Sequence, residues 1–173
     1  MRRCLLAVAS LAIGLVFAVS SIAAPLPGGA GSLVETYEDW VVSCAAPEGE
    51  TVCVMRQSQN NQETGQHILT AELRTGTDGA VEGTLLMPFG LALAQGIALA
   101  IDETEGPTFP FLTCLPQGCV APVNFDHSSL ENLKTGDALK ITVHAVNAEQ
   151  RIAFTVSLNG FTAALNRMTE LMQ

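Results

Sequence analysis

Apolar and polar residues alternate along several short stretches of the chain, most clearly near its end. Every second residue is apolar in residues 139–145 and again in residues 151–158, and residues 147–150 provide a turn between them. A period of two is typical of a strand that buries one face of a sheet. These two segments therefore predict an antiparallel hairpin.

Seven earlier segments have similar strand character and are separated by turn-forming residues. They are residues 39–45, 52–57, 67–74, 81–87, 97–102, 109–114 and 119–125. Nine strands with little helix between them fit two packed sheets better than a βαβ arrangement. We predict an all-β, single-domain β-sandwich of about nine short strands.

Two helices are expected beside the strands. Ser128 and Glu131 form a capping box for a short helix that ends near Gly136. A C-terminal helix should follow Gly160, because apolar residues then recur every three to four positions. These residues are Phe161, Leu165, Met168 and Met172. We interpret the stripe as core packing, with a partner surface as the alternative.

The first residues have the features of an export signal. Arg2 and Arg3 precede an apolar run over residues 5–19, and Ser21 and Ala23 give the small-x-small pattern of a cleavage site. An uncleaved membrane anchor is the alternative, but the run is at the short end for spanning a bilayer. The predicted organisation is a signal peptide at 1–23, a flexible linker at 24–36 and the β-sandwich domain at 37–173.

Charge narrows the classes of partner. The chain has 8 basic and 17 acidic residues, and removal of Arg2 and Arg3 with the signal leaves a net charge of 6 − 17 = −11. Phosphate binding needs clustered Lys and Arg, so nucleic acid is excluded as an expected partner. Docking on an anionic membrane is disfavoured for the same reason. Solubility is a sufficient explanation of the acidity.

Four cysteines follow the signal as two close pairs, Cys44 with Cys53 and Cys114 with Cys119. In an oxidising compartment they are expected to form disulfides. Four cysteines allow three pairings, and proximity on neighbouring strands favours the local one. Zinc binding and a redox pair are the alternatives, but the spacings and the β surroundings match neither well.

No catalytic, metal or cofactor site is predicted. His67, His127 and His144 are isolated in the sequence, and nucleophile and phosphate-loop motifs are missing from it. The acidic residues Asp102, Glu103 and Glu105 lack regular calcium-ligand spacing, so we expect a solvated turn. An enzyme with an unrecognised surface site, using His127 or His144, stays open as an alternative.

Residues 85–101 are the most apolar stretch after the signal. A transmembrane helix is disfavoured because Pro88, Gly90, Gln95 and Gly96 interrupt it. We expect two strands joined by an apolar connection across residues 89–96. The connection is either buried in the core or exposed as a contact with a partner or a membrane. In the second case Pro88, Phe89 and Leu91 are the candidate contact residues.

Four segments in this order resemble the invasion-associated locus B family of exported Gram-negative bacterial proteins. They are residues 37–44 (YEDWVVSC), 88–90 with 96–102 (PFG and GIALAID), 111–121 (FLTCLPQGCVA) and 156–161 (VSLNGF). The resemblance spans residues 37 to about 165. It implies an envelope location and, for some members, a part in host-cell invasion, and it supplies no catalytic residues.

We therefore expect a secreted, non-enzymatic protein of the periplasm or outer envelope that acts by binding an envelope or host protein. Membrane contact without spanning is compatible with this interpretation. A purely structural envelope or stress component is a further alternative. The sequence identifies neither the partner nor the oligomeric state.

Overall fold

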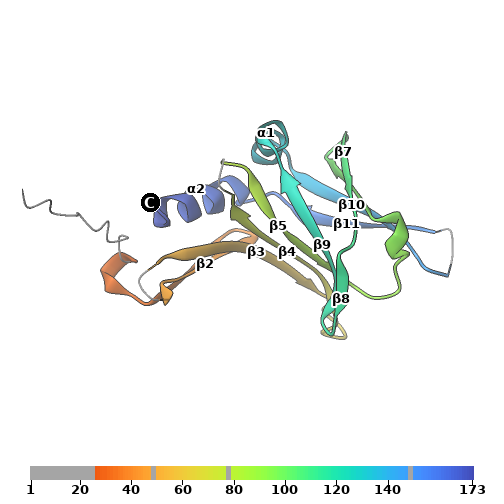
Figure 1. Cartoon of the computed structure of the whole chain (residues 1–173), viewed down its shortest axis with the longest axis horizontal. Helices are drawn as coiled ribbons and strands as arrows, with labels where there is room; N and C mark the ends of the chain where they lie inside the picture. Colours follow the sequence, from red (N-terminus) through yellow and green to blue (C-terminus); the bar gives the residue numbers. More distant parts are fainter. Residues whose placement is uncertain (1–25, 48–49, 77–78, 148–149) are drawn as a thin grey trace, which may run out of the picture.

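The computed structural model describes residues 26–47, 50–76, 79–147 and 150–173. Within these residues the chain forms eleven strands in two antiparallel sheets, together with two α-helices (Figure 1). The predicted all-β sandwich is confirmed, with two strands more than expected. The predicted signal peptide at 1–23 and its cleavage site lie outside the described residues.

The larger sheet has seven strands in the order β1-β2-β3-β4-β5-β9-β8. Each strand is antiparallel to its neighbours. The strands are β1 (Ser32–Tyr37), β2 (Trp40–Ala45), β3 (Val52–Asn60), β4 (His67–Thr75), β5 (Val81–Met87), β8 (Thr113–Leu115) and β9 (Gly118–Phe125).

The smaller sheet has four strands in the order β11-β10-β6-β7. These are β6 (Ile97–Ile101), β7 (Thr104–Phe109), β10 (Ala138–His144) and β11 (Arg151–Ser157). The predicted late hairpin is confirmed as β10 and β11. Its register places Leu139 opposite Val156 and Ile141 opposite Phe154, so apolar residues pair on one face as the alternation requires.

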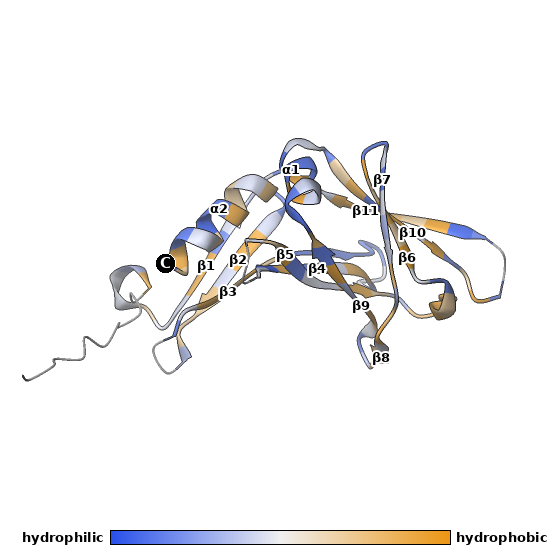
Figure 2. Cartoon of the chain, turned by 45° about the horizontal axis from the view of Figure 1, so that its top comes forward, coloured by the Kyte–Doolittle hydropathy of each residue, from blue (hydrophilic) through white to orange (hydrophobic). Residues whose placement is uncertain are grey.

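The core lies against one face of the large sheet. The small sheet covers one part of this face, and α2 (Phe161–Leu171) packs on β1, β2 and β3. Figure 2 shows the apolar and polar residues alternating along the strands. The stripe of α2 is core packing as predicted, because Phe161, Leu165 and Met168 are buried. The Phe161 ring meets Trp40 edge-on, with centroids 5.4 Å apart.

A polar junction at Ser157 joins the two sheets. The Ser157 carbonyl accepts hydrogen bonds from Trp40 Nε1 and Gln57 Nε2, both at 2.9 Å. The Ser157 N–H donates to Gln57 Oε1 at 3.0 Å, and its hydroxyl donates to Asp39 Oδ2 at 2.6 Å. The side-chain amide of Gln57 thus bonds to β11 as a neighbouring strand would, which accounts for its burial in the core.

The predicted linker was wrong for its described part. Leu26 is only 2% exposed, and residues 32–37 form β1 instead of a flexible lead. The alternation of Leu33, Glu35 and Tyr37 toward α2 explains the strand, but the preceding Gly- and Pro-rich residues masked it. Leu26 also joins the hydrophobic core.

The predicted strand at 109–114 was also wrong. Residues 104–109 form β7 in the small sheet, and the chain then crosses to the large sheet, where residues 113–115 form β8. Glu105, Gly106 and Pro107 concealed β7 because they give no apolar alternation. Proline is tolerated there since β7 is an edge strand.

The short helix α1 (His127–Thr135) starts two residues earlier than predicted. Its N-cap is Asp126, whose carboxylate accepts the Ser129 N–H at 2.8 Å, so the expected box on Ser128 was wrong. Glu131 instead pairs with Lys134 at 2.9 Å. The predicted end at Gly136 and the C-terminal helix after Gly160 are both confirmed.

Replacing Gln57 by Leu should lower the free energy of unfolding by about 1–3 kcal/mol, because the Ser157 N–H loses its partner inside the protein. Urea unfolding with the disulfides intact measures this change. Gln59→Leu is the matched control. It removes the bond to the Thr155 carbonyl and a longer bond of 3.3 Å to Gln57 Oε1 from a less buried position, and it leaves the bonds of Gln57 to Ser157 in place, so it should cost less. Equal losses of stability from the two substitutions would contradict the claim that the hydrogen bonds between Gln57 and Ser157 stabilise the junction.

Candidate contact surface

The apolar segment at 85–101 joins the two sheets. It contains the end of β5, a connection over residues 88–96 with a short 3-10 helix at Leu93–Gln95, and β6. The prediction of two strands and an apolar connection is confirmed. No helix in the described residues combines the length and apolar character needed to cross a membrane.

Backbone hydrogen bonds hold this connection against the end of β10. The Val146 N–H donates to the Gly90 carbonyl at 2.9 Å, and the Ala92 N–H donates to the His144 carbonyl at 2.8 Å. Leu91 forms an isolated bridge with Ala145 between them. The connection therefore has a fixed position beside the β10–β11 hairpin.

Three apolar side chains are exposed where these segments meet. Phe89 is 60% exposed, Leu93 40% and Val146 59%. We call these three residues the apolar tip. No charged residue occurs between Glu82 and Asp102, so the part of the tip on the connection carries no charge of its own. Such a surface suits contact with another apolar surface.

The three candidate contact residues differ in their exposure to solvent. Phe89 is exposed, Pro88 is half-buried, and Leu91 is only 6% exposed. The expectation that Leu91 forms part of an exposed contact was wrong, because its side chain belongs to the core. Leu93 and Val146 were missed. Val146 comes from a distant part of the chain, and the backbone pairing of residues 90–92 with residues 144–146 brings it here.

Both predicted disulfides are present. Cys44–Cys53 links β2 to β3 within the core, and Cys114–Cys119 links β8 to β9. Cys119 is opposite Met87, the residue before Pro88. The second disulfide thus fixes the sheet end from which the apolar connection starts.

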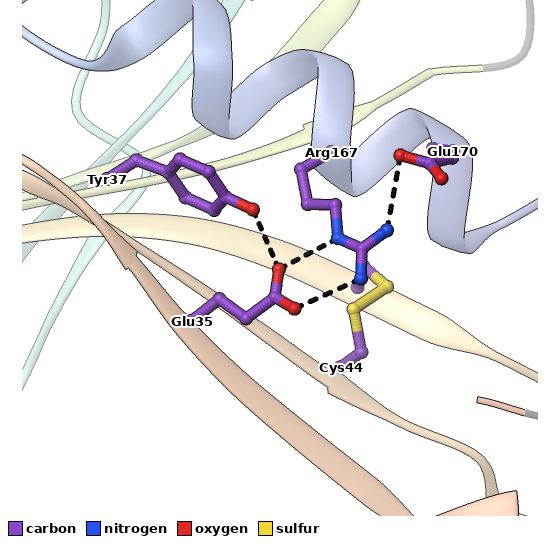
Figure 3. A network of polar contacts seen from close by, with 6 residues as sticks. Glu35, Tyr37, Cys44, Arg167 and Glu170 are labelled. Carbon is purple, nitrogen blue, oxygen red and sulfur yellow. Dashed lines mark hydrogen bonds and ion pairs between the residues drawn. A yellow bond between two sulfur atoms is a disulfide. The ribbon is translucent and has the colours of Figure 1, made fainter. Parts of the chain in front are cut away.

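A polar network ties β1 to α2 (Figure 3). The Arg167 guanidinium donates two hydrogen bonds to the Glu35 carboxylate, at 2.8 and 3.0 Å, and also pairs with Glu170 at 3.1 Å. The Tyr37 hydroxyl donates to Glu35 at 2.8 Å. Sequence reasoning missed this network because 132 residues separate Glu35 from Arg167.

The network shifts the ionisation of its members. The bonds from Arg167, and then from Tyr37, hold the pKa of the Glu35 carboxyl below its ordinary value. The hydrogen bond to Glu35 raises the pKa of Tyr37, since a tyrosinate could no longer donate it. The Glu35 charge is therefore compensated within the protein.

The outer face of the large sheet forms a shallow concavity of about 700 Å³. Val54, Arg74, Glu82 and Asn124 cross it on β3, β4, β5 and β9. Arg74 pairs with Glu82 at 2.9 Å, so these two charges on its floor offset each other. The residues that line it include neither histidine nor cysteine.

The remaining candidate residues are dispersed among the elements. His67 lies on β4, where its Nε2 is 2.9 Å from Thr70 Oγ1, His127 begins α1, and His144 ends β10. Within the described part of the chain, no three His, Cys, Asp or Glu side chains gather in a potential metal site.

Of the acidic residues near position 102, Asp102 and Glu103 form the β6–β7 turn and Glu105 lies on β7. The Asp102 carboxylate accepts the backbone N–H groups of Asp137 at 3.1 Å and Ala138 at 3.0 Å. Glu103 pairs with Lys140 at 2.7 Å. The carboxylates of Asp102 and Glu103 therefore contact residues at the start of β10. This agrees with the predicted turn at these two positions.

The fold and the disulfides place this chain in the class of two-sheet β-sandwiches that have two disulfides between neighbouring strands and a C-terminal helix. The family model described as invasion associated locus B (IalB) protein matches residues 40–169. The chain belongs to this family, which confirms the resemblance.

Curated relatives and a solved structure agree with the family. An invasion protein B homolog of Brucella abortus is 52% identical over 166 residues, covering 92% of this chain and 96% of the relative. Invasion protein B of Bartonella bacilliformis is 36% identical, covering 87% and 82%. The crystal structure of invasion associated protein B from Bartonella henselae has a TM-score of 0.75 and 32% identity, covering 80% of this chain and 96% of that one.

Replacing Glu35 by Gln should lower the Tm at neutral pH, and the difference from the wild type should shrink in acid. The folded-state pKa of Glu35 is lowered, so its contribution is present above the ordinary value of about 4.3 and is lost as the pH falls through the folded pKa. Thermal unfolding from neutral pH to acid checks this.

Glu63→Gln is the control for this experiment. Glu63 is exposed, and only its backbone N–H takes part in a described hydrogen bond, to Asn61. The control should follow the wild type at each pH. A loss at neutral pH that persists unchanged in acid would contradict an ionic role for Glu35.

Proposed function

We propose that this chain is an exported, non-enzymatic protein of the bacterial envelope that acts by binding another protein through the apolar tip. The observation that carries the proposal is the exposure of Phe89, Leu93 and Val146 on backbone held by the pairing of Leu91 with Ala145. Burial of an exposed phenylalanine and its apolar neighbours is a common source of binding energy between proteins.

The fixed geometry of the tip supports this function. Residues 90–92 are bonded to residues 144–146, so Val146 lies on paired backbone and Phe89 and Leu93 directly flank it. A surface that is ordered before binding loses less conformational entropy when a partner docks. The Cys114–Cys119 disulfide adds rigidity at the sheet end that leads into the connection.

Charge supports a protein partner over nucleic acid or an anionic membrane. The chain has a net charge of −9, and the predicted export signal contributes two of its basic residues. Both competing surfaces are negatively charged and would be repelled. A partner with an apolar patch bordered by basic residues would complement the tip and the acidic body.

The family supports the envelope setting. The Bartonella and Brucella relatives carry the name invasion protein B, and the features of residues 1–23 are those of an export signal. We extend to this chain a periplasmic or outer-envelope location and a partner from the envelope or from a host.

A photo-crosslinking residue at Phe89 should capture a specific protein in living cells, identified by mass spectrometry. The combined substitution of Phe89→Asp and Leu93→Asp should reduce affinity for that protein at least about tenfold, because charges would then enter an apolar interface. The Tm should stay unchanged, since both side chains are exposed.

Leu112 provides the matched control. It is 71% exposed on the connection between β7 and β8, outside the tip. A probe at Leu112 should not capture the same protein, and Leu112→Asp should leave the affinity unchanged. Equal capture from both positions, or binding that survives the double substitution, would refute the tip as the contact.

A further inference from the structure

The two sheets end in four edge strands, and three of these edges are protected against pairing with another chain. β7 carries Pro107 and Glu105, β8 has only three residues, and the edge of β11 is occupied by side chains of β3. Gln57 bonds both backbone groups of Ser157, and Gln59 bonds the Thr155 carbonyl at 2.7 Å. Proline, charge, short length and covering groups are the usual means of protecting an edge.

The fourth edge, β1, has none of these protections. Its six residues, Ser-Leu-Val-Glu-Thr-Tyr, include no proline and no lysine, and its pairing with β2 is regular throughout. The side chains of Ser32, Val34 and Thr36 are exposed and uncharged, with Val34 68% exposed. No strand among the described residues pairs with its outer side.

The backbone groups of these three residues point to the free side. The Ala46 N–H donates to the Gly31 carbonyl at 3.1 Å, so Gly31 faces β2. In an antiparallel ladder every second residue bonds the same neighbour, so Leu33, Glu35 and Tyr37 also face β2. The N–H and C=O groups of Ser32, Val34 and Thr36 therefore lie at the open edge.

The single charge on β1 is neutralised inside the protein. An inward-facing charge can protect an edge, but Glu35 is held by two hydrogen bonds from Arg167 and one from Tyr37 (Figure 3). The β1 edge thus carries no uncompensated charge. This matters because the net charge of −9 makes two copies of the chain repel each other elsewhere on their surfaces.

We propose that β1 pairs antiparallel with β1 of a second copy of this chain, so that the two large sheets become one continuous sheet. The two-fold axis lies at Val34. Val34 then faces Val34 of the other copy, and Ser32 faces Thr36, so all three outward residues form hydrogen-bonded pairs with two bonds each. This surface is separate from the apolar tip.

Charge selects this register over its symmetric neighbours. A two-fold axis at Glu35 would set two carboxylates directly opposite each other, which is unfavourable. An axis at Leu33 would leave Thr36 outside the paired region. With the axis at Val34, Glu35 of one copy faces Leu33 of the other. An isologous contact of this kind closes as a dimer and does not propagate.

Cysteine trapping tests the register. In the exported full chain with Cys4→Ser, the other four cysteines are bonded, so an added cysteine is the single free thiol. Val34→Cys should form a disulfide-linked dimer, because residues in a hydrogen-bonded pair have Cα atoms about 5.5 Å apart, within disulfide reach. Peptide mass spectrometry would identify the bond between the cysteines introduced at position 34 of the two copies.

The flanking positions give matched controls. Ser32→Cys alone and Thr36→Cys alone should not link, because identical residues would lie roughly 14 Å apart along the strands. A mixture of these two variants should form a disulfide between position 32 of one copy and position 36 of the other. Val52→Cys, equally β-branched in the wild type and 52% exposed on β3, should also stay monomeric.

Association is measured by sedimentation from about 10 μM to about 1 mM. The wild type should form a dimer in this range. Val34→Lys should raise the dissociation constant at least about tenfold by placing two ammonium groups opposite each other, and Val52→Lys should leave it unchanged. The Tm of both variants should match the wild type when it is measured well below the dissociation constant of the dimer, where all three proteins are monomeric.

Two results would overturn the proposal. The first is a wild type that stays monomeric at about 1 mM while Val34→Cys forms no disulfide dimer. The second is capture of a different protein by the Val34→Cys variant in living cells without a linked pair of this chain. That result would assign the edge to a foreign strand.

Discussion

The hydrogen bonds at Ser157 hold the two sheets and α2 in one arrangement. This residue ends β11, and its backbone is bonded by Trp40 from β2 and by Gln57 from β3. Three residues later, Gly160 precedes α2 as its N-cap in a left-handed conformation with φ of 84°, where an added Cβ would collide with the Tyr37 carbonyl. The direction of α2, and hence the contact of Arg167 with Glu35, depends on this junction.

The same junction decides which surfaces remain open. Its glutamine side chains occupy the edge of β11, and the contact between α2 and β1 compensates Glu35 without covering the backbone edge of β1. At the opposite side of the large sheet, Cys114–Cys119 and the bridge of Leu91 to Ala145 fix the apolar tip. The acidic body thus presents an uncharged edge and an apolar tip at different places.

The sequence patterns correctly predicted those elements whose apolar residues lie on one buried face. The alternation in β10 and β11, the cysteine pairs and the stripe of α2 all carry one buried face, and each was confirmed. β7 was missed because an edge strand buries little, so its residues show no clear alternation. β1 does alternate, but it directly follows Gly- and Pro-rich residues that are typical of a linker. Leu91 was misjudged because only its pairing with Ala145, 54 positions later, reveals its burial. The burial of Gln57 could not be predicted for the same reason, because its partner Ser157 is 100 residues away in the sequence.

Native-state hydrogen exchange of the Ser157 amide and the Trp40 indole N–H tests the central role of this junction most directly. If the junction holds the sheets together, both protons should exchange only by global unfolding, with the free energy that urea unfolding gives for the whole domain. The amide of Gln62, an exposed turn residue away from the β1 edge, serves as the internal reference for fast exchange. Exchange of Ser157 and Trp40 at a clearly lower free energy, while the central strands β4 and β5 stay protected, would contradict the account.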